Sequence, residues 1–311
     1  MSDTGRVISV NISVQKGTIK QPAAEILIDR YGVVNDAHAG LWHRQVSLLS
    51  REDIDSFTKI VGRQIKPGEF AENITIAGID LGQAAVLDRF HIGQVELQVT
   101  QIGKECHGDA CAIYLQVGKC VMPKKGIFCR VINGGKIKPG DPVEYLPRHM
   151  RFLVVTLSDR AFTGRYTDRS GPRAKQILEQ YFVDKRWHYQ IDNILLSDDT
   201  DKLSEVLTKA IDDKVDVIFT LGGTGIGPRD ITPETITAVC DKIIPGIMEN
   251  IRIRYSRKNS CALLSRSIAA IARETQIYAL PGSVRAVEEY LTEILKILEH
   301  AILMVHGLDA H

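Results

Sequence analysis

The feature that most constrains the fold is a strand that runs into a glycine-rich turn and then into a helix, within residues 215–234. Residues 215–220 are mostly apolar and β-branched, which is typical of a strand buried on both faces of a parallel sheet. The glycines at 222, 223, 225 and 227 permit backbone conformations closed to other residues and leave room for a ligand. Thr232, followed by proline and glutamate, predicts a helix with Thr232 as its N-cap. In an open α/β sheet this order of elements forms an anion-binding crevice at the carboxyl edge of the strands.

The glycine turn matches neither of two common phosphate-binding loops. A P-loop ends in Lys-Ser or Lys-Thr, which this turn lacks, and the pattern G-x-G-x-x-G counted from Gly223 ends on Pro228. A glycine turn can also serve only to let a strand and a helix pack closely, and that alternative stays open. The adjoining pair Arg229 and Asp230 favours a ligand, because a tight turn does not need two charges.

Length and charge indicate two soluble domains. A chain of 311 residues can bury two separate cores, and 39 Lys and Arg against 38 Asp and Glu leave a net charge of +1, which gives no basic field suited to nucleic acid. No signal peptide is evident, no apolar run reaches membrane-spanning length, and six cysteines do not form a disulfide framework in a chain this long. We therefore expect a cytoplasmic protein with no nucleic-acid or membrane partner.

The periodicity of the hydrophobic residues differs between the two halves. Residues 6–145 mostly alternate with period two between dense turn signals, which predicts an all-β barrel or sandwich with one helix opening at Ser50. From residue 152 onward, expected strands at 152–157, 193–196 and 215–220 alternate with expected helices, the last over 284–298. This alternation predicts a three-layer α/β domain with a mostly parallel sheet. A polar linker near 146–150 places the domains at residues 1–148 and 149–311.

Three loops that follow strands of the second half carry acidic or hydroxyl side chains. They are residues 158–160 (Ser-Asp-Arg), the pair Asp198 and Asp199, and the glycine turn that ends in Asp230. Parallel strands bring such loops to one edge of the sheet. Carboxylates facing a polyphosphate repel it by about 1–4 kcal/mol per charge pair, so the pattern predicts a Mg²⁺ ion held by one or two carboxylates and phosphate oxygens. Asp198 or Asp199 could equally cap the helix that follows.

At these residues the second half closely resembles the molybdopterin adenylyltransferase (MogA/MoaB-like) family. The matching elements, between residues 152 and 307, are Ser158-Asp159-Arg160, Gly164, Asp168-x-Ser170-Gly171-Pro172, Gly222-Gly223-Thr224-Gly225, residues 229–234, Pro245-Gly246, Leu264-Ser265-Arg266 and Leu280-Pro281-Gly282-Ser283. The resemblance implies a molybdopterin-binding fold and a nucleotidyltransferase of molybdenum cofactor biosynthesis that adenylylates molybdopterin with ATP and Mg²⁺ and releases pyrophosphate. Molybdate insertases share the glycine loop, but their first loop usually reads Tyr-Asp-Ser-Asn, so the adenylyltransferase branch is preferred.

The resemblance also implies roles for individual residues. Asp230 and Asp198 would be catalytic carboxylates and Mg²⁺ ligands. The residues that would bind molybdopterin or nucleotide are Ser158, Asp159, Arg160, Gly222, Gly223, Thr224, Gly225, Arg229, Ser265, Pro281, Gly282 and Ser283. For Asp168 and Ser170 helix capping is the preferred role. The resemblance also implies that the α/β half forms trimers.

The first half, residues 6–146, resembles a MOSC domain, a β-barrel module related to the C-terminal part of molybdenum cofactor sulfurases. The matching segments are residues 32–40, 42–49, 68–74, 103–107 and 120–128. The resemblance implies that this domain handles the molybdenum cofactor or sulfur destined for a metal site. Cys106 would be its reactive group, because Lys104 and His107 can lower the pKa of a thiol; a half-buried structural cysteine is the alternative.

Other readings of the first half stay open. A zinc site built from Cys106, His107, Cys111 and Cys120 would lack the C-x-x-C pairs of structural zinc sites. His38 and His43, with Asp36, could line an anionic pocket beside Arg44, or each could be a hydrogen-bonded residue of the barrel. The chain could also be a non-catalytic carrier of molybdopterin, or a sulfur-transfer protein acting through Cys106. The expected partners in cofactor synthesis are a molybdate insertase and a sulfur donor.

Overall fold

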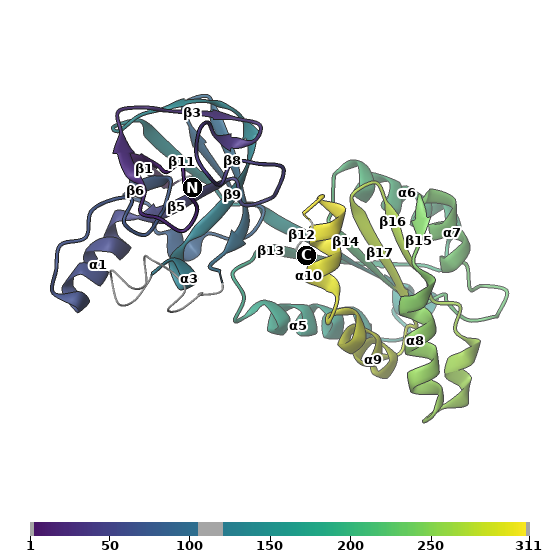
Figure 1. The fold of residues 1–311 in the computed structure, drawn as a ribbon. Coiled ribbons are helices and arrows are strands. Elements are labelled where there is room, and N and C mark those ends of the chain that lie inside the picture. Colours follow the sequence, from purple (N-terminus) through teal and green to yellow (C-terminus); the bar gives the residue numbers. More distant parts are fainter. Residues whose placement is uncertain (1–2, 105–120, 309–311) are drawn as a thin grey trace. The chain divides into compact units, whose positions relative to one another are not determined.

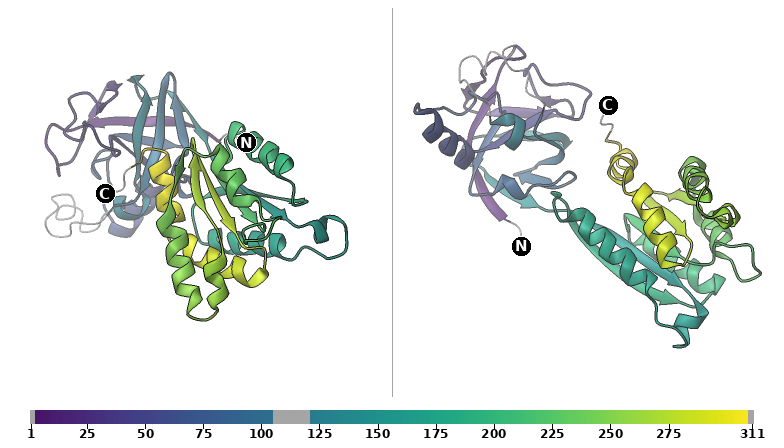
Figure 2. Two further views of the ribbon diagram at one scale, coloured as in Figure 1. Left: turned by 90° about the vertical axis from the view of Figure 1, so that its right-hand side faces the viewer. Right: turned by 90° about the horizontal axis from the view of Figure 1, so that it is seen from below.

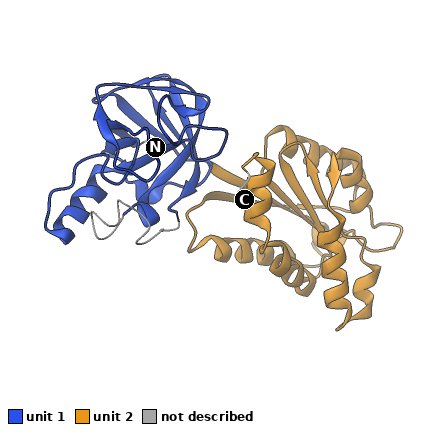
Figure 3. Cartoon of the chain, viewed as in Figure 1, with its two compact units in different colours: residues 1–148 blue, residues 149–311 orange. Residues whose placement is uncertain are grey.

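The computed structural model describes residues 3–104 and 121–308, and the chain divides into two compact units, Met1–Arg148 and His149–His311 (Figure 3). Cys106, His107, Cys111 and Cys120 lie outside the described residues, and with them the predicted reactive thiol and the alternative zinc site. In the parts of the chain that the structure covers, no helix combines the length and the apolar character that crossing a membrane requires.

Unit 1 is a β-barrel (Figure 1). Its strands in spatial order are β1 (Asp3–Ile12), β6 (Ile74–Ala77), β5 (Val46–Ser50), β9 (Ile127–Asn133), β8 (Val95–Ile102), β7 (Arg89–Ile92) and β11 (Pro142–Leu146), and the pairing of β11 with β1 closes the ring. Flanking strands are β2 (Gln21–Ala23), β3 (Ile26–Asp29), β4 (Gly32–Val33) and β10 (Gly135–Ile137). Alternate residues such as Val95, Leu97 and Val99 on β8 fill the core, as the period of two predicts.

One principal helix, α1 (Arg51–Val61), packs beside the barrel, and its start at Ser50 is confirmed. The Ser50 side chain accepts a hydrogen bond from the Asp53 N–H at 2.9 Å, which satisfies a backbone donor of the first turn. Ile54 is fully buried in a small second cluster with Phe70 and Met122. The described residues of the unit also contain two short turns of helix, η1 (Leu81–Gln83) and α3 (Met122–Lys125).

Unit 2 is built on one sheet whose strands carry the loops of interest. The spatial order is β13 (His188–Leu196), β12 (His149–Leu157), β14 (Val217–Leu221), β17 (Thr275–Leu280), β16 (Ala269–Ala272) and β15 (Lys242–Ile243). The first four strands are mutually parallel, and β16 and β15 are antiparallel to their neighbours. The mostly parallel sheet that the strand–helix alternation predicts is therefore present.

Helices cover both faces of this sheet (Figure 2). On one face Val155 and Ile218 pack against Leu203 of α6 (Thr200–Asp212), next to α7 (Thr232–Val239). On the other face Phe152 lies against Phe182 of α5 (Ser170–Phe182), with ring centroids 5.2 Å apart, and α9 (Val284–Ile294) packs beside α5. Because successive residues of a buried strand point to opposite faces, both sets of strand residues must be apolar.

The closing helix predicted over residues 284–298 is two helices, α9 and α10 (Leu298–Val305). Between them the Lys296 and Ile297 N–H groups donate to Glu293 O and Ile294 O, which tightens the chain into i→i−3 turns and interrupts the α-helix. Leu298 still falls on the same apolar stripe and is fully buried. The period of the hydrophobic residues therefore continues across the break, and the sequence pattern does not reveal it.

Candidate active site

The four parallel strands of unit 2 end at the same edge of the sheet. Leu157 of β12 pairs with Leu196 of β13, and Leu221 of β14 pairs with Leu280 of β17, each at the last residue of its strand. The loops that leave these ends, residues 158–160, 197–199, 222–230 and 281–283, therefore emerge side by side. This is the edge at which ligands bind in open α/β sheets.

The glycine loop is held in place by Thr232. Gly222 has φ +116° and Gly223 has φ +63°, and an added Cβ would lie 2.4 Å from Leu157 O or from Thr232 Oγ1, respectively. Thr232 Oγ1 donates to Gly222 O at 2.8 Å, and its N–H donates to Gly223 O at 3.0 Å. Thr232 is thus the first residue of α7 and a clamp on the loop, and its prediction as the N-cap is wrong: the N-cap position is Ile231, with no capping side chain.

Asp230 stands at the end of the same loop, folded back over it. Its carboxylate accepts a hydrogen bond from the Gly227 N–H at 2.8 Å. A Cβ on Gly225 would lie 2.7 Å from the same Asp230 oxygen, so the carboxylate can approach the backbone only where the side chain is absent.

Asp198 and Asp159 bind each other from neighbouring loops. The Asp159 N–H donates to the Asp198 carboxylate and the Asp198 N–H donates to the Asp159 carboxylate, both at 3.1 Å. Arg229, from the glycine loop, forms an ion pair with Asp159. Asp199 instead caps α6, where its side chain accepts from the N–H groups of Asp201 and Lys202. The structure thus turns Asp198, and not its neighbour, toward the other acids.

The electrostatics of this cluster suit a cation. Burial, together with the carboxylates of Asp159 and Asp230, raises the pKa of Asp198, against the opposing effects of the Asp159 N–H and the Arg229 guanidinium. In the described residues no three His, Cys, Asp or Glu side chains converge closely enough to hold a metal by themselves. Oxygen donors with excess negative charge and too few ligands for a closed cage fit Mg²⁺, which takes its remaining ligands from phosphates and water.

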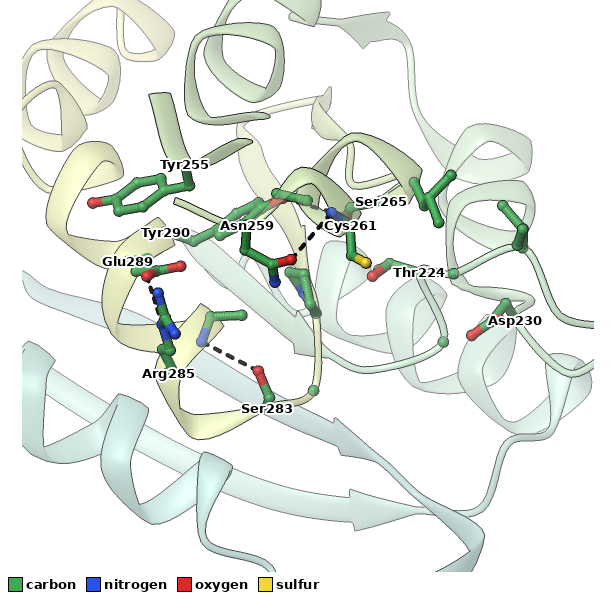
Figure 4. A pocket seen from close by; sticks show the side chains of 18 residues that line it. Thr224, Asp230, Tyr255, Asn259, Cys261, Ser265, Ser283, Arg285, Glu289 and Tyr290 are labelled. Atoms are coloured by element: carbon green, nitrogen blue, oxygen red, sulfur yellow. Dashed lines mark hydrogen bonds and ion pairs between the residues drawn. The ribbon is translucent and has the colours of Figure 1, made fainter. Parts of the chain in front are cut away.

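A pocket of about 460 Å³ opens beside the glycine loop (Figure 4). The sequence-predicted residues that line it are Gly223, Thr224, Gly225, Asp230, Ser265, Pro281, Gly282 and Ser283. The predicted residues that do not line it are Ser158, Asp159, Arg160, Asp198, Gly222 and Arg229. Gly222 lies close to the pocket, because a Cβ added to Gly282 would be 3.2 Å from the Gly222 Cα. Two predicted hydroxyls have capping partners, since Ser158 caps α4 (Asp159–Phe162) and Ser283 caps α9.

The far wall of the pocket consists of residues that the sequence did not single out. They are Tyr255, Asn259, Cys261, Arg285, Glu289 and Tyr290, from α8 (Pro245–Ser256), η3 (Ser260–Leu264) and α9. Figure 4 shows Thr224 and Asp230 at one end of the pocket and the ion-paired Arg285 and Glu289 at the other. The Tyr290 hydroxyl donates to Ser265 Oγ at 3.3 Å. Only Tyr290 carried a sequence signal, and that signal was its place on an apolar helix stripe.

Of the residues expected to line an anionic pocket in unit 1, Asp36 and His38 bond to each other, and the other two contact neighbouring residues of the barrel. Asp36 forms an ion pair with Lys20, and both side chains are only 1% exposed. Burial alone would raise the pKa of Asp36, but hydrogen bonds from His38 and Lys20 outweigh it and hold the pKa well below its usual range. The Arg44 guanidinium stacks on Trp42, 4.8 Å from the ring centroid, and the His43 carbonyl accepts from Thr100. The Asp36 carboxylate is therefore buried and bonded to Lys20 and His38, and it does not face an open pocket.

Comparison with known proteins gives a separate result for each half of the chain. The family described as "Probable molybdopterin binding domain" matches residues 153–300, and the family described as "MOSC domain" matches residues 35–144. A molybdopterin adenylyltransferase of Helicobacter pylori is 33% identical over 156 residues, which are 50% of this chain and 86% of that protein. Molybdenum cofactor biosynthesis protein B of Staphylococcus carnosus is 36% identical, over 49% of this chain and 87% of that protein.

Among solved structures, the molybdopterin biosynthesis enzyme MoaB of Thermus thermophilus is 32% identical, with 51% of this chain and 97% of that chain covered and a TM-score of 0.46. The match to the molybdopterin-binding family falls in unit 2, where the glycine loop and the three acids lie. The chain belongs to the molybdopterin adenylyltransferase (MogA/MoaB-like) family through its second half, and its first half is a MOSC domain.

Proposed function

We propose that unit 2 transfers the adenylyl group of ATP to molybdopterin and releases pyrophosphate. A phosphate oxygen of molybdopterin would attack the α-phosphorus of ATP, and the bond from that phosphorus to the bridging oxygen of the β-phosphate would break, so that pyrophosphate leaves with the bonding electrons. Mg²⁺, when bound, supplies charge neutralisation at these phosphates. The arrangement of the acids supports this proposal most directly: Asp230 lies on the glycine loop, and Asp198 is bonded to Asp159, which pairs with Arg229 of that loop.

In this proposal the residues of the chain bind and orient the substrates. Asp230 and Asp198 would hold Mg²⁺, and Arg229 would offset phosphate charge from its place beside Asp159. The loop at residues 222–225 would let phosphates approach the backbone, and Ser265 would contact the product inside the pocket. A carrier without chemistry is less well supported, because clustered carboxylates repel a phosphate ligand unless a cation lies between them.

The test is pyrophosphate release by the purified chain supplied with ATP, Mg²⁺ and molybdopterin. Asp230→Ala should reduce the rate by a factor of about 10²–10³, as expected for a group that serves transition-state charge. Asp213→Ala is a suitable control, because Asp213 follows α6 at the far end from the site. A rate near that of the unsubstituted chain in Asp230→Ala would refute the role given to Asp230.

For unit 1 we propose binding of the molybdenum cofactor, or sulfur transfer through Cys106 from a partner that donates sulfur. Cys129, the unit's described cysteine, is fully buried, and burial raises its pKa, so it is unsuited to hold a thiolate. Mass spectrometry after exposure to a sulfur donor tests the idea, with Cys106→Ser as the matched variant. A Cys106 that stays unmodified would remove sulfur transfer from consideration.

Trimer formation and action alongside a molybdate insertase are further parts of the proposal.

A further inference from the structure

The side chain of Arg266 binds three acceptors of the glycine loop and the helix that follows it. Its Nε donates to Gly225 O at 2.5 Å and its Nη2 donates to Asp230 O at 2.6 Å. Its Nη1 forms an ion pair with Glu234 in the first turn of α7, and the guanidinium lowers the pKa of that carboxyl. One planar group thus joins both ends of the segment 225–230 to the start of α7.

The segment between these two carbonyls depends on such bonds for its shape. Residues 226–229 are exposed, so apolar packing contributes little to their position. Inside the segment, the Gly227 N–H donates to the Asp230 carboxylate at 2.8 Å and the Asp230 N–H donates to Gly227 O at 3.1 Å. The guanidinium therefore fixes the backbone of the residue whose carboxylate faces the pocket.

Arg266 is itself anchored in the opposite wall of the pocket. Its N–H donates to Thr224 O at 2.8 Å, and the flanking carbonyls of Ser265 and Ser267 accept from Arg252 Nη1 at 3.4 and 3.0 Å. Ser265 lines the pocket on the same strip of chain. Arg266 therefore links the pocket wall that contains Ser265 to the loop that carries Asp230.

We propose that Arg266 is a positioning residue that holds Asp230 in the geometry needed to bind Mg²⁺. The proposal rests on the function proposed above for Asp230. Three of the five guanidinium N–H groups of Arg266, one on each nitrogen, already donate to protein acceptors, and through these bonds it acts on the Asp230 loop. A guanidinium offers its donors in a rigid fork, whereas a lysine ammonium is a point charge that cannot reach the three acceptors together. Preserving the charge alone should therefore fail.

The experiment compares Arg266→Lys and Arg266→Gln with Arg151→Lys in the full chain. Arg151 also donates a guanidinium N–H to a backbone carbonyl, Asp213 O at 2.6 Å, but at the opposite end of the strands. The first readout is hydrogen–deuterium exchange without substrates. Exchange at the amides of Gly227 and Asp230 should become about tenfold faster in both Arg266 variants, while amides of β14 stay protected, which shows that the fold is intact.

The second readout is pyrophosphate release against Mg²⁺ and ATP concentration. Both Arg266 variants should need more Mg²⁺ and lose about 10–100-fold in kcat, with the KM for ATP at saturating Mg²⁺ nearly unchanged. Unchanged exchange in the loop, or a defect confined to the KM for ATP, would overturn the positioning role. If the unsubstituted chain released no pyrophosphate, the proposed function would fail, and the exchange comparison would still decide whether Arg266 braces the loop.

Discussion

At the scale of single residues, Asp198 and Asp199 are neighbours with different tasks. Asp199 caps α6, and Asp198 exchanges hydrogen bonds with Asp159. We predict that Asp199→Ala lowers the free energy of unfolding of unit 2 by about 1 kcal/mol, as loss of an N-cap does, and keeps pyrophosphate release. Asp198→Asn should abolish most of that release with little loss of stability. Urea unfolding and the pyrophosphate assay check both, and the same outcome for the two variants would contradict the assignment.

The raised pKa of Asp198 gives a pH prediction. A carboxyl whose pKa is higher in the folded chain binds more protons there than in the unfolded chain, so its contribution to stability is largest in acid. That contribution declines as pH rises from the ordinary value of 3.8 through the raised pKa. Unfolding free energies of the original chain and Asp198→Asn, measured from pH 4 to 7, should therefore diverge in favour of the variant. If the unfolding free energies of the two proteins changed with pH in the same way, the pKa of Asp198 would not be raised by the fold.

At the scale of elements, alanine substitutions at two glycines of the loop should have different effects, one on stability and one on activity. Gly222→Ala places a Cβ 2.4 Å from Leu157 O at a positive φ, so strain should cost about 1–3 kcal/mol of unfolding free energy. Gly225→Ala meets instead the movable carboxylate of Asp230, so stability should change little and pyrophosphate release should fall sharply. Gly246→Ala, with nothing within 4 Å of the added Cβ, is the matched control. Full activity in Gly225→Ala would mean that the observed approach of Asp230 is not needed.

Local pattern was sufficient to predict elements wherever one residue's neighbours in sequence determine its conformation. The start of α1 at Ser50 follows from a serine hydroxyl and an N–H three residues later. Thr232 was mistaken for a cap because its partner, Gly222 O, comes within reach only after the loop has folded back by ten residues. The break before Leu298 was missed because both helices keep the same buried stripe.

At the scale of the whole molecule, the topology of the sheet explains which parts of the site could be predicted. The acidic residues lie at the same edge of the sheet because they follow parallel strands. Parallel strands can be predicted from the sequence because they are short apolar runs. The opposite wall comes from α8, η3 and α9, whose positions depend on how helices pack over the sheet. Residues such as Tyr255 and Glu289 carry no local signal of that packing. Sequence therefore predicted the charged edge and missed the wall that makes it a pocket.

The two units have separate hydrophobic cores, so damage to one should leave the other intact. Among the described residues, the apolar clusters around Val95 and around Ile54 consist of barrel residues and the cluster around Ile218 of unit 2 residues, and every residue that lines the candidate pocket belongs to unit 2. Asp36→Asn leaves the Lys20 ammonium buried in the barrel without its counter-charge, which should destabilise unit 1 by about 3–5 kcal/mol. Loss of the Lys20 proton would reduce that cost, since burial already lowers its pKa.

Thermal unfolding of Asp36→Asn followed by calorimetry should show two transitions, of which only one moves to lower temperature. Pyrophosphate release below that transition should match that of the unsubstituted chain, because the Asp36 charge acts only within the barrel core. The variant thus separates the stability of the MOSC domain from the chemistry of unit 2. A parallel fall in pyrophosphate release would mean that the barrel contributes to adenylylation, and the assignment of the reaction to unit 2 alone would be wrong.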